Sequence, residues 1–299
     1  MKQPFVFFGS GPVALESLRL LKQDFIIEAI ITKKATEQEM SSACPDTPLF
    51  SVSNNQELER IITEQSFRSQ VGVLIDFGVI VSQKVIDAFL KGIVNSHFSL
   101  LPELRGADPI SFAILEGKIE TGVSLMLLVK AMDEGPLLAQ ARHRLTGTEN
   151  TPELTEKLVQ ISYRLIKENL EKYLSDQLRA QDQAAWQQRN RKEASYTRKL
   201  TKQDGLIDWH KTADRLQREI RAYAQWPKSR ARLGEIDVIL TKARVLDQTG
   251  NPGILFIHDK SLAVHCGDQA LLIENLVPVG KKPMDSQAFL AGYKHRLHL

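Results

Sequence analysis

A polar pair ends an apolar run in the stretch "GIVNSHFSLLPELRGADP" (residues 92–109). Asn95 and His97 are two residues apart, so on a strand their side chains share one face. An amide donates hydrogen bonds, and an imidazole exchanges a proton near neutral pH. Asp133, in "KAMDEGP", is followed by a Gly-Pro turn that would lift its carboxylate toward the same place. Together the three groups can orient an imidazole and stabilise an oxyanion.

Each of these residues also has an ordinary structural interpretation. Asn95 can cap a turn, His97 can be a half-buried structural histidine, and Asp133 is typical of a turn. Arg105 and Gly106 fit a surface loop. The catalytic interpretation therefore rests on the combination, and it needs no Ser or Cys nucleophile if the substrate brings its own amine.

The apolar runs of the first half of the chain predict the elements that position these residues. Strands are expected in residues 5–8, 25–32, 49–53, 71–78, 92–99, 121–129 and 136–145. Helical patterns alternate with the earlier runs and indicate a parallel α/β sheet, in which sites form at the carboxyl ends of strands. Residues 33–47 are polar and are expected to form a loop. A long helix is predicted from Thr151, taken as its N-cap, to Leu174.

A glycine-rich turn follows the first predicted strand. Gly9, Gly11 and Ala14 fit the pattern G-x-G-x-x-A that binds dinucleotides. The acidic residue expected at the end of the second strand is missing, because "IITKK" stands there and Glu28 comes too early. We interpret the turn as a tight loop near a ligand.

The composition is that of a globular protein with about two domains: 299 residues, 42% hydrophobic and 25% charged. No apolar run is long enough to predict a membrane span. Cys44 and Cys266 have no metal-ligand spacing, so no metal site is predicted and a cytoplasmic location is expected.

Positive charge gathers in the C-terminal part. Residues 1–177 hold 18 Lys and Arg against 23 Asp and Glu, whereas residues 178–299 hold 21 against 13. This asymmetry indicates either a polyanionic partner or a solvated basic surface. Residues 178–204 are polar and basic and read as a linker. A helix ending at Pro227 is expected next, followed by short strands of a small barrel or sandwich.

The stretch "NSHFSLLPELRGADPISFAILEGKIETGVSLMLLVKAMDEGPLL" resembles the core of the folate-dependent formyltransferases. The shared pattern is N-x-H, S-L-L-P, R-G, P-I, E-T-G-V and a D-x-G turn. Two later segments, "REIRAYAQWP" and "PVGKKPM", resemble the branch of that family that acts on methionyl-tRNA.

The resemblance implies an α/β fold with a Rossmann-like N-terminal formyltransferase domain (1–177), a basic linker (178–204) and a C-terminal OB-type β-barrel domain that binds tRNA (205–299). It implies transfer of a formyl group from 10-formyltetrahydrofolate to the α-amine of initiator methionyl-tRNA, for translation initiation. The catalytic residues of the family fall on Asn95, His97 and Asp133. A monomer is expected.

Two sets of binding residues are expected, the first from the resemblance and the second from the positive charge of the C-terminal part. The folate-contacting positions fall on Ser99, Leu100, Leu101 and Pro102 and on Phe77, Gly78 and Val79. The positive charges expected to contact tRNA are Arg189, Arg191, Lys192, Arg198 and Lys199 in the linker and Lys281 and Lys282 near the end of the chain.

The sequence departs from the family pattern in three places. Asp76 and Asp108 replace small or apolar residues. The segment 33–47 lacks the longer, basic, glycine-rich insertion of family members that act on tRNA. This last departure favours an alternative acceptor, a nucleotide-linked amino-sugar, whereas the basic linker and the C-terminal segments favour tRNA. An RNA-binding protein without activity would have no need of Asn95, His97 and Asp133 together.

Overall fold

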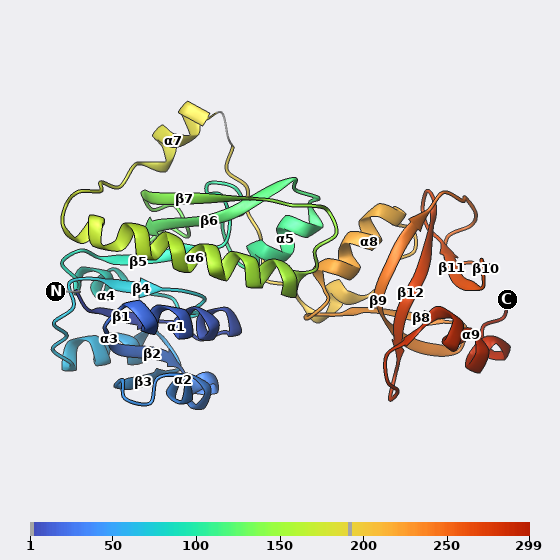
Figure 1. Cartoon of the computed structure of the whole chain (residues 1–299), viewed down its shortest axis with the longest axis horizontal. Coiled ribbons are helices and arrows are strands. Elements are labelled where there is room, and N and C mark those ends of the chain that lie inside the picture. The colour runs from blue at the N-terminus through green and yellow to red at the C-terminus, as the bar shows by residue number, and fades with distance from the viewer. Residues whose placement is uncertain (1–2, 191–192) are drawn as a thin grey trace. The chain divides into compact units, whose positions relative to one another are not determined.

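The computed structural model describes residues 3–190 and 193–299, and these form two compact units (Figure 1). The first unit contains Met1–Pro109, Glu120–Arg144 and Thr155–Thr197. The second contains Ile110–Ile119, Leu145–Leu154 and Arg198–Leu299. Both units therefore draw on separate pieces of the chain. The domain bounds inferred from sequence, 1–177, 178–204 and 205–299, remain a prediction.

The first unit is built on a sheet with the strand order β3-β2-β1-β4-β5-β6-β7. Its strands are β1 (Phe5–Phe8), β2 (Ile27–Lys33), β3 (Leu49–Val52), β4 (Gly72–Leu74), β5 (Ile93–His97), β6 (Glu120–Leu127) and β7 (Leu137–Arg144). All seven runs that the sequence marked as strands form strands, although the run 71–78 is a strand only at Gly72–Leu74. Its last residues form a loop that begins at Asp76, where φ is +48°.

The expectation of a parallel sheet is wrong for its last two strands. The strands from β3 to β5 pair in parallel, but β6 pairs antiparallel with β5, and β7 antiparallel with β6. The β6–β7 pairing follows from a short connection that contains no helix to carry the chain back across the sheet, whereas the β5–β6 connection contains α5 and yet returns antiparallel. The sheet is therefore mixed.

Helices cover both faces of this sheet. They are α1 (Pro12–Asp24), α2 (Glu37–Ala43), α3 (Asn55–Glu64), α4 (Gln83–Asp87), α6 (Thr151–Leu174) and α7 (Gln183–Asn190), with a 3₁₀ turn η1 (Lys34–Thr36) before α2. On one face, α3 and α4 pack against Val6, Phe8 and Ile31. On the other, α6 lies beside α1, where Lys167 Nζ is 2.9 Å from Asp24 Oδ2 (Figure 1).

Two expectations about the helices need correction. Residues 33–47 are not a loop, because η1 and α2 occupy most of them, with Met40 buried at the inner side of α2. The long helix is capped by Asn150 rather than Thr151: the Asn150 side chain accepts from Glu153 N and the Glu153 carboxylate accepts from Asn150 N. The N-terminus of α3 is capped by Asn54, whose side chain accepts from Glu57 N at 3.0 Å.

The second unit is an antiparallel β domain. Its strands are β8 (Ser229–Leu233), β9 (Ile236–Leu246), β10 (Leu255–His258), β11 (Ser261–His265), β12 (Ala270–Pro278) and β13 (Met284–Asp285), in the order β10-β11-β12-β9-β8 with β13 beside β12. The helices α5 (Pro109–Leu115), α8 (Ala213–Ala222) and α9 (Ser286–Tyr293) and the turns η2 (Lys202–Gly205) and η3 (Lys294–Arg296) complete the list. The helix predicted to end at Pro227 ends instead at Ala222. The core packs α8 and α9 on the sheet through Leu216, Ile220 and Phe289.

No helix among the described residues is long and apolar enough to cross a membrane.

Candidate active site

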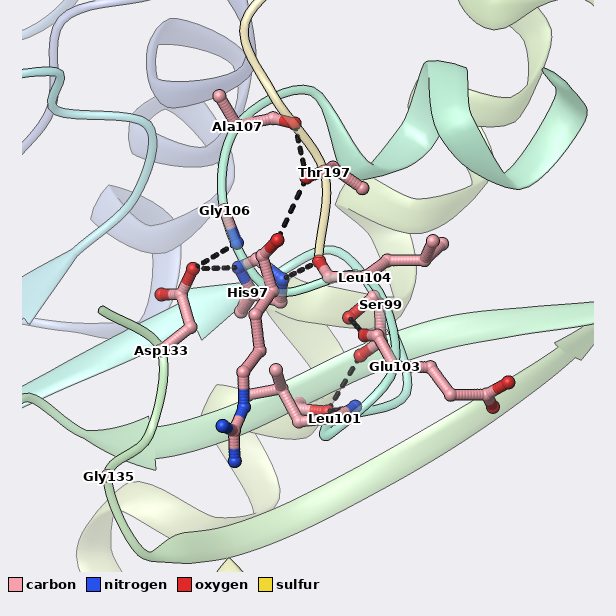
Figure 2. A network of polar contacts seen from close by, with 12 residues as sticks. His97, Ser99, Leu101, Glu103, Leu104, Gly106, Ala107, Asp133, Gly135 and Thr197 are labelled. Atoms are coloured by element: carbon pink, nitrogen blue, oxygen red, sulfur yellow. Dashed lines mark hydrogen bonds and ion pairs between the residues drawn. The ribbon is translucent and has the colours of Figure 1, made fainter. Parts of the chain in front are cut away.

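His97, the last residue of β5, is held from both sides of its ring. Its Nε2 lies 2.9 Å from the backbone oxygen of Leu104, and its Nδ1 lies 3.7 Å from Oδ2 of Asp133 (Figure 2). A carbonyl oxygen can only accept, so Nε2 carries the hydrogen. In the neutral ring Nδ1 then has a free lone pair that faces the carboxylate. Nδ1 is therefore the ring nitrogen that is free to accept a hydrogen bond or a proton from a substrate.

The Asp133 carboxylate reaches His97 from the connection between β6 and β7. Gly106 N donates to Asp133 Oδ2 at 2.7 Å, and the carboxylate is 12% exposed. Asp133 itself has a φ of +53°, a left-handed conformation that Asp tolerates better than most residues. The expected parallel sheet would have placed Asp133 after the carboxyl end of a strand parallel to β5. β6 is instead antiparallel to β5, but the connection turns back and brings the side chain to His97.

Asn95 lies two residues before His97 on β5 and is buried, with 7% of the residue exposed. Among the described residues, none makes a hydrogen bond with its amide. The neighbour Ser96 points to the opposite face, where its hydroxyl lies 2.7 Å from that of Ser162 on α6. The alternation expected of a strand thus places Asn95 and His97 on one face. A buried amide with its donors unused is suited to stabilise a charge that develops on a substrate.

The predicted folate-contacting residues divide into buried and accessible ones. Ser99, Leu100, Leu101 and Pro102 are buried, and Leu101 packs with Met126 and Leu137. Their backbone is also engaged, since Ser124 Oγ donates to Ser99 O and Gln140 Nε2 donates to Leu101 O. The side chains of this segment are therefore buried in the protein, and the segment contributes to the shape of the site rather than offering side chains to it.

The second predicted folate-contacting segment lies in the loop after β4. Phe77 is in the core, edge-on to Phe8, whereas Gly78 is exposed and Val79 is half-buried. Gly78 has a φ of +63°, and a Cβ there would lie 3.0 Å from the Lys33 ammonium. Gly78 and Val79 are therefore the accessible members of the predicted set.

Sequence reasoning missed a network around Arg105, which had been interpreted as surface loop. Arg105 is 7% exposed, and its guanidinium lies 3.0 Å from the Glu134 carboxylate, 3.1 Å from the Tyr196 hydroxyl and 2.7 Å from Gln183 Oε1. Thr197 Oγ1 donates to the carbonyl oxygens of both Arg105 and Ala107, as Figure 2 shows for Ala107. Residues expected to form a free linker are thus part of the site.

The carboxylate of Asp76 lies against the glycine-rich turn before α1. A Cβ on Gly11 would lie 1.8 Å from Asp76 Oδ2, so the Asp76 carboxylate stands at the first turn of α1. A phosphate bound there would meet this negative charge, which disfavours a dinucleotide site. The Asp76 residue as a whole is exposed, and its carboxyl is the less hydrated part. Loss of hydration raises the pKa of its carboxyl to about 6, with a further rise from Asp108 and a partial offset from Lys33.

The residues predicted to contact tRNA are spread over several environments. Lys199, Lys281 and Lys282 are exposed. Arg198 is exposed but forms a bidentate ion pair with Asp204, in which Nη1 lies 2.9 Å from Oδ2. Arg189 lies on α7. Arg191 and Lys192 lie outside the described residues.

An amide, an imidazole and a carboxylate without a protein nucleophile among them are groups suited to a group-transfer site. Family comparison agrees with this class. The model described as "Formyl transferase" matches residues 16–170, and the model described as "Formyl transferase, C-terminal domain" matches residues 199–294.

Curated relatives narrow the class. A methionyl-tRNA formyltransferase from Nitratidesulfovibrio vulgaris is 35% identical over 243 residues, covering 78% of this chain and 71% of the relative. One from Roseiflexus castenholzii is 30% identical over 310 aligned residues, covering 98% and 97%. The chain belongs to the methionyl-tRNA formyltransferase family, which is folate-dependent. The predicted family and fold class, an α/β formyltransferase domain with a C-terminal β domain, are confirmed.

Solved structures share the fold at lower identity. The N-formyltransferase of Helicobacter canadensis, in complex with folinic acid and dTDP-3-aminofucose, has a TM-score of 0.68 at 17% identity and covers 91% of this chain and 98% of its own. HypX from Aquifex aeolicus in complex with tetrahydrofolic acid has a TM-score of 0.64 at 15% identity, covering 97% of this chain and 47% of HypX. At these identities the likeness shows the fold alone.

Proposed function

We propose that this chain transfers the formyl group of 10-formyltetrahydrofolate to the α-amine of initiator methionyl-tRNA, for translation initiation in the cytoplasm. The observation that carries the proposal is the pairing of a buried amide without a hydrogen bond, Asn95, with an imidazole whose Nδ1 faces a carboxylate. Relatives of 30–35% identity over most of the chain bear the name of this activity.

Asn95 is proposed to stabilise the oxyanion. When the acceptor amine attacks the formyl carbon, the carbonyl oxygen gains negative charge and the carbon becomes tetrahedral. The Asn95 amide can donate to that oxygen, since none of its donors is used within the described residues. His97 is less suited to this role, because Nε2–H is bound to the Leu104 oxygen. One such donor contributes about 10²–10³-fold to kcat.

His97 and Asp133 are proposed to move the proton. The attacking nitrogen becomes cationic and must lose a proton before the tetrahedral species can collapse. Nδ1 of His97 can take that proton, and Asp133 at 3.7 Å then faces an imidazolium. Collapse expels the N10 nitrogen of the folate, which regains a proton as it leaves. The formyl group ends on the acceptor amine, and tetrahydrofolate is released.

The surroundings of the site fit a folate co-substrate by their chemistry. Leu101 and Phe77 are buried apolar side chains, and Gly78 and Val79 are accessible in the loop after β4, the strand that pairs with β5. A pterin is a flat, largely apolar ring with polar edges, which such a mixture of apolar walls and backbone groups accommodates.

A nucleotide-linked amino-sugar is the second candidate acceptor. The observation that favours it is the segment of η1 and α2, which carries the acidic pair Glu37 and Glu39 on its first helical turn and only Lys33 and Lys34 as positive charges. The excess of positive charge in residues 178–299 supports tRNA instead, since tRNA is a polyanion.

A direct comparison of acceptors tests the proposal. Formyl transfer from 10-formyltetrahydrofolate is measured with initiator methionyl-tRNA and with dTDP-3-aminofucose, on the same enzyme preparation. We expect transfer to the tRNA that weakens steeply with salt and no transfer to the sugar. Turnover of the sugar without turnover of the tRNA would overturn the proposed acceptor.

A further inference from the structure

We propose that Gln183, the first residue of α7, is a positioning residue that fixes the Asp133 loop against His97. The catalytic part of this inference rests on the function proposed above. Gln183 does not touch the reacting atoms and acts through the backbone of the loop from Ala131 to Pro136. Its segment was expected from sequence to be a linker.

The Gln183 carboxamide joins three groups that are far apart in sequence. Its Nε2 donates to the backbone oxygens of Asp133 at 2.8 Å and Gly135 at 2.7 Å. Its Oε1 accepts from Arg105 Nη2 at 2.7 Å. Only 3% of the residue is exposed. A buried side chain with both donors and its acceptor engaged holds its partners in one geometry, because water cannot replace the bonds.

The Asp133 loop needs an external support. Since β6 is antiparallel to β5, the chain must turn back after Leu127 to bring Asp133 to His97. The turn is tight: Asp133 adopts a φ of +53°, and a Cβ on Gly135 would lie 1.7 Å from Leu127 O. Left-handed conformations of residues other than Gly persist where the surroundings hold them. Gln183 binds the two carbonyl groups that flank Glu134 in this turn.

The other end of the contact is equally fixed. Arg105 is buried, and its guanidinium also pairs with Glu134 of the same loop at 3.0 Å. The backbone next to it is joined to residues 195–197: Arg105 N donates to Ser195 O at 2.9 Å, and Thr197 N donates to Arg105 O at 2.7 Å. Gln183 and residues 195–197 thus fix the position of the Asp133 loop relative to the backbone at Arg105 and Gly106.

The relative position of these two backbone segments sets the contacts of the Asp133 carboxylate with Gly106 N and with His97. The Asp133 carboxylate accepts from Gly106 N at 2.7 Å and faces His97 Nδ1 at 3.7 Å (Figure 2). A shift of the loop by about 1 Å would lengthen both contacts, and a misplacement of that size can cost about 10²-fold in rate. We expect substrate binding to stay unchanged, because only 3% of Gln183 is exposed.

The test compares two variants of Gln183 with a control on the same helix. Gln183→Met keeps the length of the side chain and removes its hydrogen bonds, and Gln183→Glu removes the two donors. Gln188→Glu adds the same negative charge at an exposed position of α7 and controls for weaker attraction of tRNA. We expect both Gln183 variants to lower kcat about 10- to 100-fold with a KM for 10-formyltetrahydrofolate within about threefold of wild type. The control should keep the wild-type kcat.

A second measurement does not depend on activity. In protein labelled with ¹⁵N-glycine, the Gly106 amide reports its hydrogen bond to Asp133 through its chemical shift and its protection from hydrogen exchange. We expect both Gln183 variants to move this resonance toward that of Asp133→Ala, with unfolding temperatures that show a folded protein. An unchanged Gly106 resonance, or full kcat in Gln183→Met, would overturn the proposal. An inactive wild type with the expected Gly106 shifts would instead refute the proposed function and keep the positioning role.

Discussion

The two halves of the polar segment between residues 183 and 205 use their hydrogen bonds differently. In the first unit, Gln183 and Thr197 bond to the backbone around Asp133 and Arg105, largely out of water. In the second unit, Arg198 and Thr201 bond to Asp204 at the surface, where the Arg198 side chain is 60% exposed. The first half supports the candidate active site, and the second half closes a local turn.

The difference teaches that burial, rather than residue type, decides what such a segment does. Both halves read as polar and basic in the sequence. A hydrogen bond contributes about 1 kcal/mol wherever it forms, but a buried group that loses its partner costs about 1–3 kcal/mol, and an exposed one is rescued by water. Substitutions of the buried groups in the first half of the segment should therefore change catalysis, and those in the second half should change mainly stability.

The largest expected difference is between two neighbouring residues of strand β5, Asn95 and Ser96. Asn95→Ala removes the proposed oxyanion donor and should lower kcat about 10²–10³-fold. The unfolding temperature should change little, because the amide makes no hydrogen bond within the described residues. Ser96→Ala is the matched control: it breaks the buried pair with Ser162 and should lower the unfolding temperature while keeping kcat. Steady-state kinetics and calorimetry on both variants check this, and equal losses of kcat would contradict it.

In the second unit, Asp204→Ala should lower stability without lowering kcat. The Asp204 carboxylate accepts from Thr201 N at 2.7 Å in a capping box around η2, and the Arg198 guanidinium is the main cause that lowers its pKa. We expect a loss of about 1–2 kcal/mol at pH 7.

The pH dependence of that loss has a definite sign. A carboxyl with a lowered pKa in the folded state stabilises it above its unfolded value near 4, and this contribution fades as the pH falls. Calorimetric unfolding of Asp204→Ala and wild type at pH 7 and at pH 3 should therefore give a smaller difference at pH 3. A difference that grows on acidification would show that the ion pair is not its source.

The smallest change in stability is expected at Asp76, where the negative charge destabilises the folded protein. Burial, the first cause, and Asp108 raise the pKa of Asp76 to about 6. Stability is therefore lost as the pH rises from about 4 through 6. Asp76→Asn should stabilise the protein by about 1 kcal/mol at pH 8 and by almost nothing at pH 4. The value at pH 8 is smaller than the pKa shift alone would give, because solvent screens the charge of an exposed residue. Asn also tolerates the φ of +48°. Equal stabilisation at both pH values would contradict the account.

Much of the candidate site could be predicted from the sequence, because it depends on local periodicity. The two-residue spacing of Asn95 and His97 predicts a shared face, and the strand β5 provides it. Asp133 was predicted from its residue type and its turn, although through a strand direction that is wrong. An antiparallel return inside an otherwise parallel sheet depends on pairing between distant strands, which periodicity does not reveal.

The support of the site could not be predicted in this way. The bonds of Gln183 span 48 to 78 residues of sequence, and nothing in "QDQAAWQQ" distinguishes the buried glutamine of this segment from the exposed or half-buried ones. The segment 33–47 was assigned to a loop for a related reason. Its short helix α2 is held by the burial of Met40 rather than by a long amphipathic pattern.

The most direct test of the central claim is the rate constant of a single turnover of formyl transfer in Asp133→Asn. Asn keeps the shape of Asp and an oxygen for the Gly106 amide, so the substitution removes mainly the charge that faces His97. With both substrates saturating, we predict a rate constant at least about 100-fold below that of wild type, with unchanged binding of folate and an unchanged unfolding temperature. A rate constant within about threefold of wild type would contradict the claim that His97 and Asp133 move the proton.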